Sequence, residues 1–250
     1  MAHLKGKTAI VTGASKGIGA GVAKRFAAEG ARVVVNYASD TAGAGRVVDA
    51  IKAEGGEAIA VAGDVSKAAD VASLFDAAEA AFGQVDVLVN NAGVFRFGPF
   101  EETDEEDIRR QFEVNVFGTL LTCREAARRF GPAGGAIVNL SSIGSRNVSP
   151  GMVVYSATKG AIDTITEGLS RGLGPRNIRV NSIAPGAIDT EGLAGVGFVE
   201  GSDMRKAVLA ATPLGRIGMP DDVARLAVFL ASDASSFVSG ERVMAAGGWR

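Results

Sequence analysis

Short apolar runs alternate along the chain with longer stretches in which apolar residues recur at helical spacing. The short runs, such as 33–35 and 87–89, lack alternating polar positions, which is typical of strands buried on both faces of a parallel sheet. The longer stretches predict amphipathic helices. Strands are predicted at 8–12, 32–36, 57–62, 85–90, 135–141, 178–184 and 242–245, and helices at 17–29, 41–54 and 67–82, among others.

The repeated strand–helix–strand order favours an α/β fold, a doubly wound parallel sheet of about seven strands with helices on both faces. Because no linker or break in composition divides the 250 residues, we expect a single domain over 1–250. The stretch 189–203 follows the sixth strand and contains four glycines. It is either an ordinary surface loop or a lid over a pocket, which would extend to about residue 212.

Charge and hydropathy exclude several classes of function. Lys and Arg number 26 against 28 Asp and Glu, for a net charge of −2, so the chain lacks the basic surplus typical of nucleic-acid or anionic-membrane binding. No apolar run reaches the ~18–20 residues of a membrane span. The N-terminal segment has no apolar region typical of a signal peptide. We therefore expect a cytoplasmic protein.

The chain has one cysteine and one histidine. Cys123 alone cannot form an internal disulfide, and its apolar surroundings favour a buried structural thiol. With only Cys123 and His3, a His/Cys zinc site is disfavoured, and a Ser-His-Asp triad would depend on His3 in the N-terminal segment. We expect no metal site.

A glycine-rich segment, Gly13-Ala-Ser-Lys-Gly-Ile-Gly19, joins the first predicted strand to the first predicted helix. Backbone N–H groups of such a turn, together with the positive end of the helix, bind phosphate. The G-x-x-x-G-x-G spacing differs from the commoner G-x-G-x-x-G, and glycines also make plain tight turns. Its place directly after the first strand nevertheless predicts dinucleotide binding and a Rossmann-type fold.

The end of the second predicted strand bears on which dinucleotide is bound. An NAD site usually has a carboxylate about 20 residues after the glycine loop, whereas this chain has Asn36 there, followed by Ser39. Lys16 adds a positive charge that would favour a 2′-phosphate. Asp40 is interpreted as the cap of the next helix. We therefore expect NADP(H) as cofactor, with NAD(H) less favoured.

Tyr155 and Lys159 are four residues apart and would share one face of a helix. A nearby ammonium favours the ionised phenol, so the spacing predicts a lowered pKa for Tyr155 and a role in general acid–base chemistry. The same spacing also occurs on many solvated helix faces.

With the glycine loop and the Tyr155/Lys159 pair together, the chain resembles the short-chain dehydrogenase/reductase family over about residues 6 to 248. The resemblance implies that Tyr155 exchanges a proton with the substrate oxygen and that Lys159 lowers the pKa of the phenol and contacts the nicotinamide ribose. It further implies that Ser142, thirteen residues before Tyr155, hydrogen-bonds the substrate oxygen, and that Asn115 holds a water in a proton relay. The implied cofactor contacts are Gly13, Ser15, Lys16, Gly17, Ile18, Gly19, Asn36, Ser39, Asp64, Val65, Asn91, Ala92, Gly93, Tyr155, Lys159, Pro185, Gly186, Ile188 and Thr190.

The substrate is less defined than the chemistry. The uncharged 130–136 segment lacks the arginine that related 3-oxoacyl-carrier-protein reductases often place there, although Arg176 could serve instead. Free ketones, sugars or polyhydroxylated aromatics are therefore favoured, with the carrier-bound substrate as the alternative. A dinucleotide-binding sensor without turnover is the non-enzyme alternative. The resemblance also implies a homotetramer.

Overall fold

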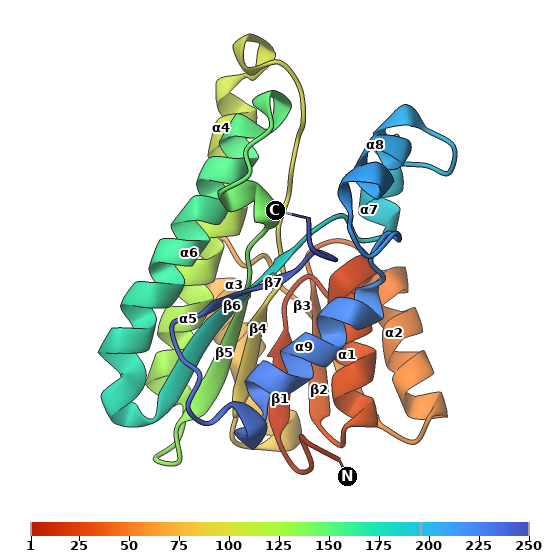
Figure 1. Cartoon of the computed structure of the whole chain (residues 1–250). Helices are drawn as coiled ribbons and strands as arrows, with labels where there is room; N and C mark the ends of the chain where they lie inside the picture. Colours follow the sequence, from red (N-terminus) through yellow and green to blue (C-terminus); the bar gives the residue numbers. More distant parts are fainter. Residues whose placement is uncertain (1, 196, 250) are drawn as a thin grey trace.

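The computed structural model describes residues 2–195 and 197–249. In this part of the chain seven parallel strands form one sheet in the order β3-β2-β1-β4-β5-β6-β7 (Figure 1). This confirms the predicted fold class. The strands are β1 Thr8–Val11, β2 Arg32–Tyr37, β3 Glu57–Ala62, β4 Val87–Asn90, β5 Gly135–Leu140, β6 Ile178–Pro185 and β7 Arg242–Ala245.

Helices cover both faces of the sheet (Figure 1). One face carries α1, α2 and α9, and the other carries α3, α5 and α6. The predicted helices 17–29, 41–54 and 67–82 are confirmed to within a residue at each end. The helices are α1 Gly17–Ala28, α2 Thr41–Ala53, α3 Ala68–Phe82, α4 Glu105–Phe112, α5 Gly118–Arg129, α6 Val153–Leu173, α7 Glu191–Ala194, α8 Asp203–Ala211 and α9 Pro220–Ala231.

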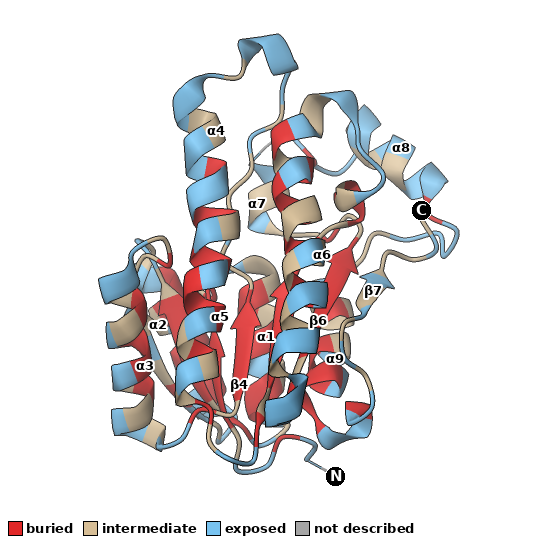
Figure 2. Ribbon diagram, turned by 90° about the vertical axis from the view of Figure 1, so that its left-hand side faces the viewer, coloured by how far each residue is buried: buried red, intermediate tan, exposed pale blue. Residues whose placement is uncertain are grey.

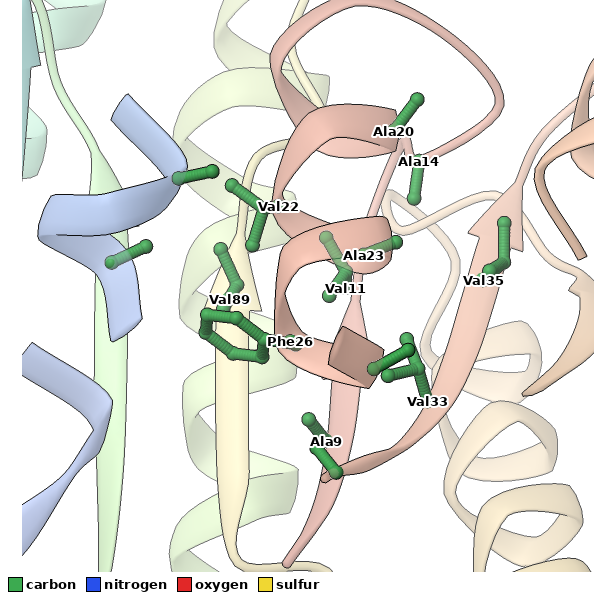
Figure 3. Close-up of a cluster of buried hydrophobic side chains, with 14 of the residues drawn as sticks. Ala9, Val11, Ala14, Ala20, Val22, Ala23, Phe26, Val33, Val35 and Val89 are labelled. Carbon is green, nitrogen blue, oxygen red and sulfur yellow. The ribbon is translucent and has the colours of Figure 1, made fainter. Parts of the chain in front are cut away.

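The core has two halves because the strands are buried on both faces. Alternate side chains of β1 point to opposite faces, so that Ala9 and Val11 pack in the cluster under α1 while Ile10 packs in the cluster under α3 and α5. Figure 3 shows the first cluster, in which the fully buried Phe26 of α1 lies among valines of the central strands. This arrangement is what the uninterrupted apolar runs predict.

Parallel strands bring all their carboxyl ends to one edge of the sheet. The chain reverses its direction of winding between β1 and β4, which are neighbours in the sheet. In open α/β sheets ligands bind in the crevice at this switch point. The glycine loop after β1 and the loop after β4 therefore lie side by side at the edge where a cofactor is expected.

The stretch after β6 is more regular than expected. The prediction of a loop over 189–203 is wrong in part, because α7 begins within it and α8 follows. Thr190 caps α7 by accepting a hydrogen bond from the N–H of Leu193, and Ser202 caps α8 by accepting from the N–H of Arg205. Both helices lie beyond the carboxyl edge of the sheet (Figure 1). The four glycines favoured a loop, although Thr190 and Ser202 are residue types typical of helix N-caps.

Among the helices of the described residues, none is long and apolar enough to cross a lipid bilayer.

Candidate active site

The glycine loop is shaped by contacts that only glycine tolerates. Gly13 and Gly17 have φ of +60° and +57°, a region that side chains disfavour. A Cβ on Gly13 would lie 2.8 Å from the Cα of Ala92, and one on Gly19 would lie 2.4 Å from Nδ2 of Asn91. These glycines thus let the loop after β1 touch the loop after β4. Gly19 packs against its neighbours, whereas Gly13 and Gly17 line a recess.

That recess, of about 360 Å³, ends at the N-terminus of α1. Lys16, the N-cap residue of α1, makes no capping hydrogen bond with its side chain in the described part of the chain. Backbone N–H groups of the first turn are therefore available to an anion. The N–H of Gly17 donates to Oε2 of Glu191 at 3.2 Å, so a carboxylate already occupies part of this anion site. Backbone N–H groups at a helix N-terminus also bind phosphate oxygens. The predicted contacts that line this recess are Gly13, Ser15, Lys16, Gly17, Ile18, Asn36, Ser39, Asp64, Val65, Asn91, Ala92, Gly93 and Thr190.

Asn36, predicted to meet the adenosine ribose, turns its side chain inward. It is 1% exposed; Oδ1 accepts from the N–H of Gly13 at 3.3 Å and Nδ2 donates to the carbonyl of Gly63 at 3.0 Å. Asn36 therefore holds the glycine loop against the end of β3. The more exposed Ser39 lines the recess next to it. Asp40 caps α2, its Oδ1 accepting from the N–H of Gly43 at 2.8 Å, as expected.

Asp64 lies at the far wall of the recess. Its Oδ1 accepts from the hydroxyl of Ser66 at 2.7 Å, and its Oδ2 lies 3.6 Å from the guanidinium of Arg110. Burial favours the protonated carboxyl, but the hydrogen bonds from Ser66 and the charge of Arg110 lower the pKa of Asp64 overall. Arg110, from α4, was missed by the sequence because no motif surrounds it.

A second recess, of about 180 Å³, shares Ile18, Asn91, Gly93 and Thr190 with the first. Ser142 comes from the turn after β5, while Tyr155 and Lys159 come from the first turns of α6. The tertiary structure thus brings the three predicted reactive side chains to one wall. The predicted residues that line this recess are Ile18, Asn91, Gly93, Ser142, Tyr155, Lys159, Pro185, Gly186, Ile188 and Thr190.

Tyr155 is held among aromatic rings. The rings of Phe95 and Phe97 stack at a centroid distance of 4.9 Å, and each meets the Tyr155 ring edge-on at 6.0 Å. Burial raises the pKa of Tyr155 to about 12, although a hydrogen bond with Ser142 lowers it. The lowered pKa predicted from the Tyr155/Lys159 spacing is therefore wrong for the protein alone, because burial outweighs the hydrogen bond with Ser142.

Lys159 is hydrogen-bonded to the main chain rather than to the hydroxyl of Tyr155. Its Nζ donates to the carbonyl of Leu140 at 2.7 Å and lies 5.6 Å from the centre of the Tyr155 ring. Burial disfavours the ammonium and lowers the pKa of Lys159 to about 8, an effect opposed by the charge of Asp163. The ammonium thus faces the cleft at an unusually low pKa, next to the phenol.

Asn115 lies in a π-helical segment, Glu113–Phe117, between α4 and α5. Its side chain accepts from the N–H of Val94 and donates to the carbonyl of Val94, both at 2.8 Å, and donates to the hydroxyl of Thr158 at 3.0 Å. With 1% exposure, Asn115 is buried behind the recess and fixes the loop after β4 to α6. Such π-bulges are frequent at functional sites. Its role in a water relay stays a prediction.

Two arginines near the cleft face solvent. Arg96 pairs with Asp107 on α4, and its side chain is 62% exposed. Arg146 is 73% exposed. The recess beside Tyr155 is therefore lined by Phe95, on which Phe97 stacks, rather than by these charges. Within the described residues, no group of three or more His, Cys, Asp or Glu side chains could hold a metal ion.

Comparison with known proteins agrees with this geometry. A family model described as Enoyl-(Acyl carrier protein) reductase matches residues 13–250. The chain is 52% identical to an uncharacterized oxidoreductase of Methylorubrum extorquens, over 100% of both chains. It is 43% identical to 3beta-hydroxysteroid dehydrogenase 1 of Eggerthella lenta, over 98% of this chain and 94% of that protein.

A solved structure shows the same architecture. The crystal structure of a short chain dehydrogenase from Burkholderia cenocepacia in complex with NADP is 37% identical to this chain. The two superpose with a TM-score of 0.92, and the match covers 98% of each chain. Identity over nearly the whole length, the shared fold and the Ser142/Tyr155/Lys159 wall lead to one conclusion: the chain belongs to the short-chain dehydrogenase/reductase family of oxidoreductases.

Proposed function

We propose that this protein is an NADP(H)-dependent reductase that interconverts an uncharged ketone and the corresponding secondary alcohol. The observation that supports this most directly is the recess in which Ser142, Tyr155 and Lys159 share one wall. This recess shares lining residues with the recess at the glycine loop.

The proton chemistry follows from the side chains of this wall. The phenol of Tyr155, whose pKa is raised to about 12, is protonated at neutral pH and can donate to a carbonyl oxygen. The hydroxyl of Ser142 accepts from the N–H of Gly144 at 3.0 Å, which orients it to donate toward the same oxygen. The ammonium of Lys159 stabilises the phenolate left behind.

The cofactor recess would hold the dinucleotide through Gly13–Ile18 and the loop after β4, and the bound nicotinamide supplies or accepts hydride. Two features support NADP(H) over NAD(H). The carboxylate of Asp40 is engaged in capping α2, and Lys16 and Ser39 line the recess at the end of β2. A measurement of NADH use as efficient as that of NADPH would contradict this preference.

The substrate proposed is an apolar, ring-containing ketone. Phe95 and Phe97 form a stacked aromatic wall beside the phenol, and such a surface favours flat or alicyclic molecules without charge. Sugars and polyhydroxylated aromatics share the same carbonyl chemistry and belong in the test panel. The name of the Eggerthella lenta relative, a hydroxysteroid dehydrogenase, agrees with an alicyclic secondary alcohol.

The carrier-protein alternative receives less support from the arrangement of arginines. Arg176 lies with Arg124 and Arg128 at a recess between α5 and α6. Arg176 also lies two residues before the start of β6, whereas Ser142 lies two residues after the end of β5. These ends lie at opposite edges of a parallel sheet, so a carrier bound at Arg176 would be distant from the cleft.

One experiment tests the function as a whole. Initial rates would be measured against ketones, sugars and a β-ketoacyl thioester with each cofactor, for the wild type and for Tyr155→Phe. We expect turnover of apolar ketones with NADPH and a loss of about 100-fold or more in Tyr155→Phe with NADPH binding retained. A wild type that binds NADPH but reduces none of the panel would favour the dinucleotide-binding sensor.

Two further proposals concern the molecule as a whole. We propose a homotetramer, for which the exposed apolar side chains of Phe117 on the π-helical segment and Leu120 on α5 are the support. A cytoplasmic location is also proposed, from the sequence alone.

A further inference from the structure

A largely buried pair of opposite charges lies behind the turn that carries Ser142. Nε of Arg242 is 3.1 Å from Oδ2 of Asp163, and the two side chains are only 11% and 13% exposed. Arg242 begins β7 and Asp163 lies on α6, one helical turn after Lys159. The cost of removing two charges from water is large unless their hydrogen bonds are satisfied. The hydrogen-bond partners of this pair therefore indicate which segment it stabilises.

The partners all belong to the turn that carries Ser142. The hydroxyls of Ser141 and Ser145 donate to the two oxygens of Asp163 at 2.6 and 2.7 Å. A terminal nitrogen of Arg242 donates to the main-chain carbonyl of Ser142 at 3.0 Å. The pair thus forms hydrogen bonds with this turn at residues 141, 142 and 145.

Lys159 completes a regular arrangement at the end of β5. Three consecutive residues are each bonded to a different charged side chain: the carbonyl of Leu140 to Lys159, the hydroxyl of Ser141 to Asp163, and the carbonyl of Ser142 to Arg242. The charges therefore alternate in sign from the reactive cleft to the edge of the sheet.

Sheet register explains how residues so distant in sequence meet. Arg242 of β7 pairs with Ser182 of β6, which in turn pairs with Asn139 of β5. β7 therefore begins at the level where β5 ends, two strands away, or about 9–10 Å. The long guanidinium side chain spans this gap to the turn after β5.

We propose that the Arg242–Asp163 pair is a positioning element that holds Ser142 and Lys159 in the arrangement needed for proton transfer. The inference rests on the carbonyl reduction proposed above. Arg242 fixes the main chain of Ser142, and Asp163 keeps the Lys159 ammonium charged. Neither residue is catalytic, since both act through the groups they hold.

The electrostatic part of the proposal has a definite sign. Lys159 is faced by Asp163 on its own helix and by Tyr155 one turn earlier. Asp163 is faced in turn by Arg242 from β7 and by Arg146, whose Nε lies 3.9 Å from Oδ2. Removing the Asp163 charge deprives the ammonium of its counter-charge and should lower the pKa of Lys159. Removing the Arg242 charge leaves Asp163 less compensated and should raise it.

The kinetic test compares Arg242→Met with a matched control, Arg179→Met. Arg179 is also partly buried and also donates to main-chain carbonyls, those of Leu230 and Ser232. It lies near the start of β6, at the amino ends of the strands and therefore away from the cleft. We expect Arg242→Met to lower kcat about 10- to 100-fold with the KM for NADPH within about twofold, because small misplacements of reactive groups are costly. Arg179→Met should leave both constants within about twofold of the wild type.

Chemical rescue and a double variant separate positioning from folding. Arg242 lines a surface recess of about 390 Å³, through which guanidinium ion can enter in Arg242→Ala, where the truncated side chain leaves its site open. Millimolar guanidinium, against equal sodium chloride, should restore kcat severalfold. If Arg242→Met folds poorly, Asp163→Asn/Arg242→Gln removes both charges. It should melt closer to the wild type yet keep the low kcat.

A measurement without turnover distinguishes failure of this inference from failure of the proposed function. NMR of ¹³C-labelled lysine, with Lys159→Arg to assign the signal, reads the pKa of Lys159 directly. A fall in Asp163→Asn and a rise in Arg242→Met support the inference whatever the substrate. An unchanged pKa in both variants would overturn it, as would a kcat of Arg242→Met within twofold of the wild type or equal to that of Arg179→Met. Absence of turnover in the wild type would instead reject only the proposed function.

Discussion

Tyr155 and Lys159 share a helix face, yet burial rather than their mutual spacing dominates their protonation. The phenol and the ammonium are shifted in opposite directions, to pKa values of about 12 and about 8. Both shifts favour the neutral form of each group, as expected where solvent is largely excluded. Around neutral pH the protein therefore presents a protonated acid beside a cation that is close to losing its charge.

This gives a pH dependence with a defined sign. The group that deprotonates first as the pH rises is Lys159, at about 8, whereas Tyr155 stays protonated beyond that point. We expect kcat/KM for NADPH, which reports the free enzyme, to be constant below this pH and to fall above it. A pH profile at limiting NADPH measures this. A profile that stays flat to pH 10 would show that the charge of Lys159 is not required.

At the scale of elements, the site depends on two loops and a short helix at the carboxyl edge of the sheet. The glycine loop after β1 contacts the loop after β4 so closely that side chains are excluded from it. The first residue of α7, Glu191, reaches the first N–H of α1. We therefore expect cofactor binding at this edge to depend on how α1 and α7 approach each other.

Gly19→Ala tests the contact between the two loops. The new methyl group would lie 2.4 Å from Nδ2 of Asn91 and 2.6 Å from the carbonyl oxygen of Gly13, so one loop must move. We expect cofactor affinity to fall about tenfold or more, measured by NADPH fluorescence titration.

Gly45→Ala is the matched control, since a Cβ there meets nothing within 4 Å on α2. It should leave affinity unchanged and raise the free energy of unfolding by about 0.5–1 kcal/mol, because alanine loses less backbone entropy than glycine in a helix. Equal NADPH affinity in Gly19→Ala and Gly45→Ala would contradict the packing argument.

Glu191→Gln tests the approach of α7. The carboxylate of Glu191 occupies a donor that a phosphate would use and carries the same sign of charge. Its neutralisation should tighten NADPH binding about two- to fivefold at low salt, with a smaller effect at high salt. Glu200→Gln, in the segment between α7 and α8, serves as the control. Weaker binding in Glu191→Gln would mean that the carboxylate supports the bound state.

At the scale of the whole molecule, α4, α5 and α6 form a broad outer surface (Figure 2). Phe112, Phe117, Leu120 and Val153 leave 40–51% of their surface exposed along these elements. Apolar side chains gathered on one face are typical of subunit contacts. We also predict that the C-terminal segment 247–250 lies near a subunit contact; its last residue, Arg250, lies outside the described residues.

Phe117→Glu tests the proposed assembly. A carboxylate placed in an apolar contact cannot be solvated there, so the variant should dissociate to a smaller species. Light scattering at micromolar concentration measures the mass. Leu209→Glu, an exposed position on α8, should keep the mass of the wild type. A wild type that is already monomeric would reject the tetramer.

Much of the fold was available from the sequence because it is encoded locally. Uninterrupted apolar runs located each strand to within a few residues, and helical spacing of apolar residues located the predicted helices. The order of elements predicted a parallel sheet, and parallel strands necessarily bring Gly13–Gly19, Asn91–Gly93 and Ser142 to one edge. Tyr155 and Lys159 share a face by helix geometry alone.

Three features required the tertiary structure. Asn36 lines the recess at the glycine loop, but the hydrogen bonds of its amide to Gly13 and Gly63, from two other segments, could not be predicted from the sequence. The pKa of Tyr155 changes direction because burial depends on what packs around a residue. Arg242 reaches Ser142 across 100 positions, and its own sequence neighbourhood contains no sign of this. The sequence by itself determined the strands and helices and the identity of the reactive side chains, since these depend on local periodicity and spacing. Orientation, burial and long-range charge pairing were decided only when the sheet brought distant segments into contact.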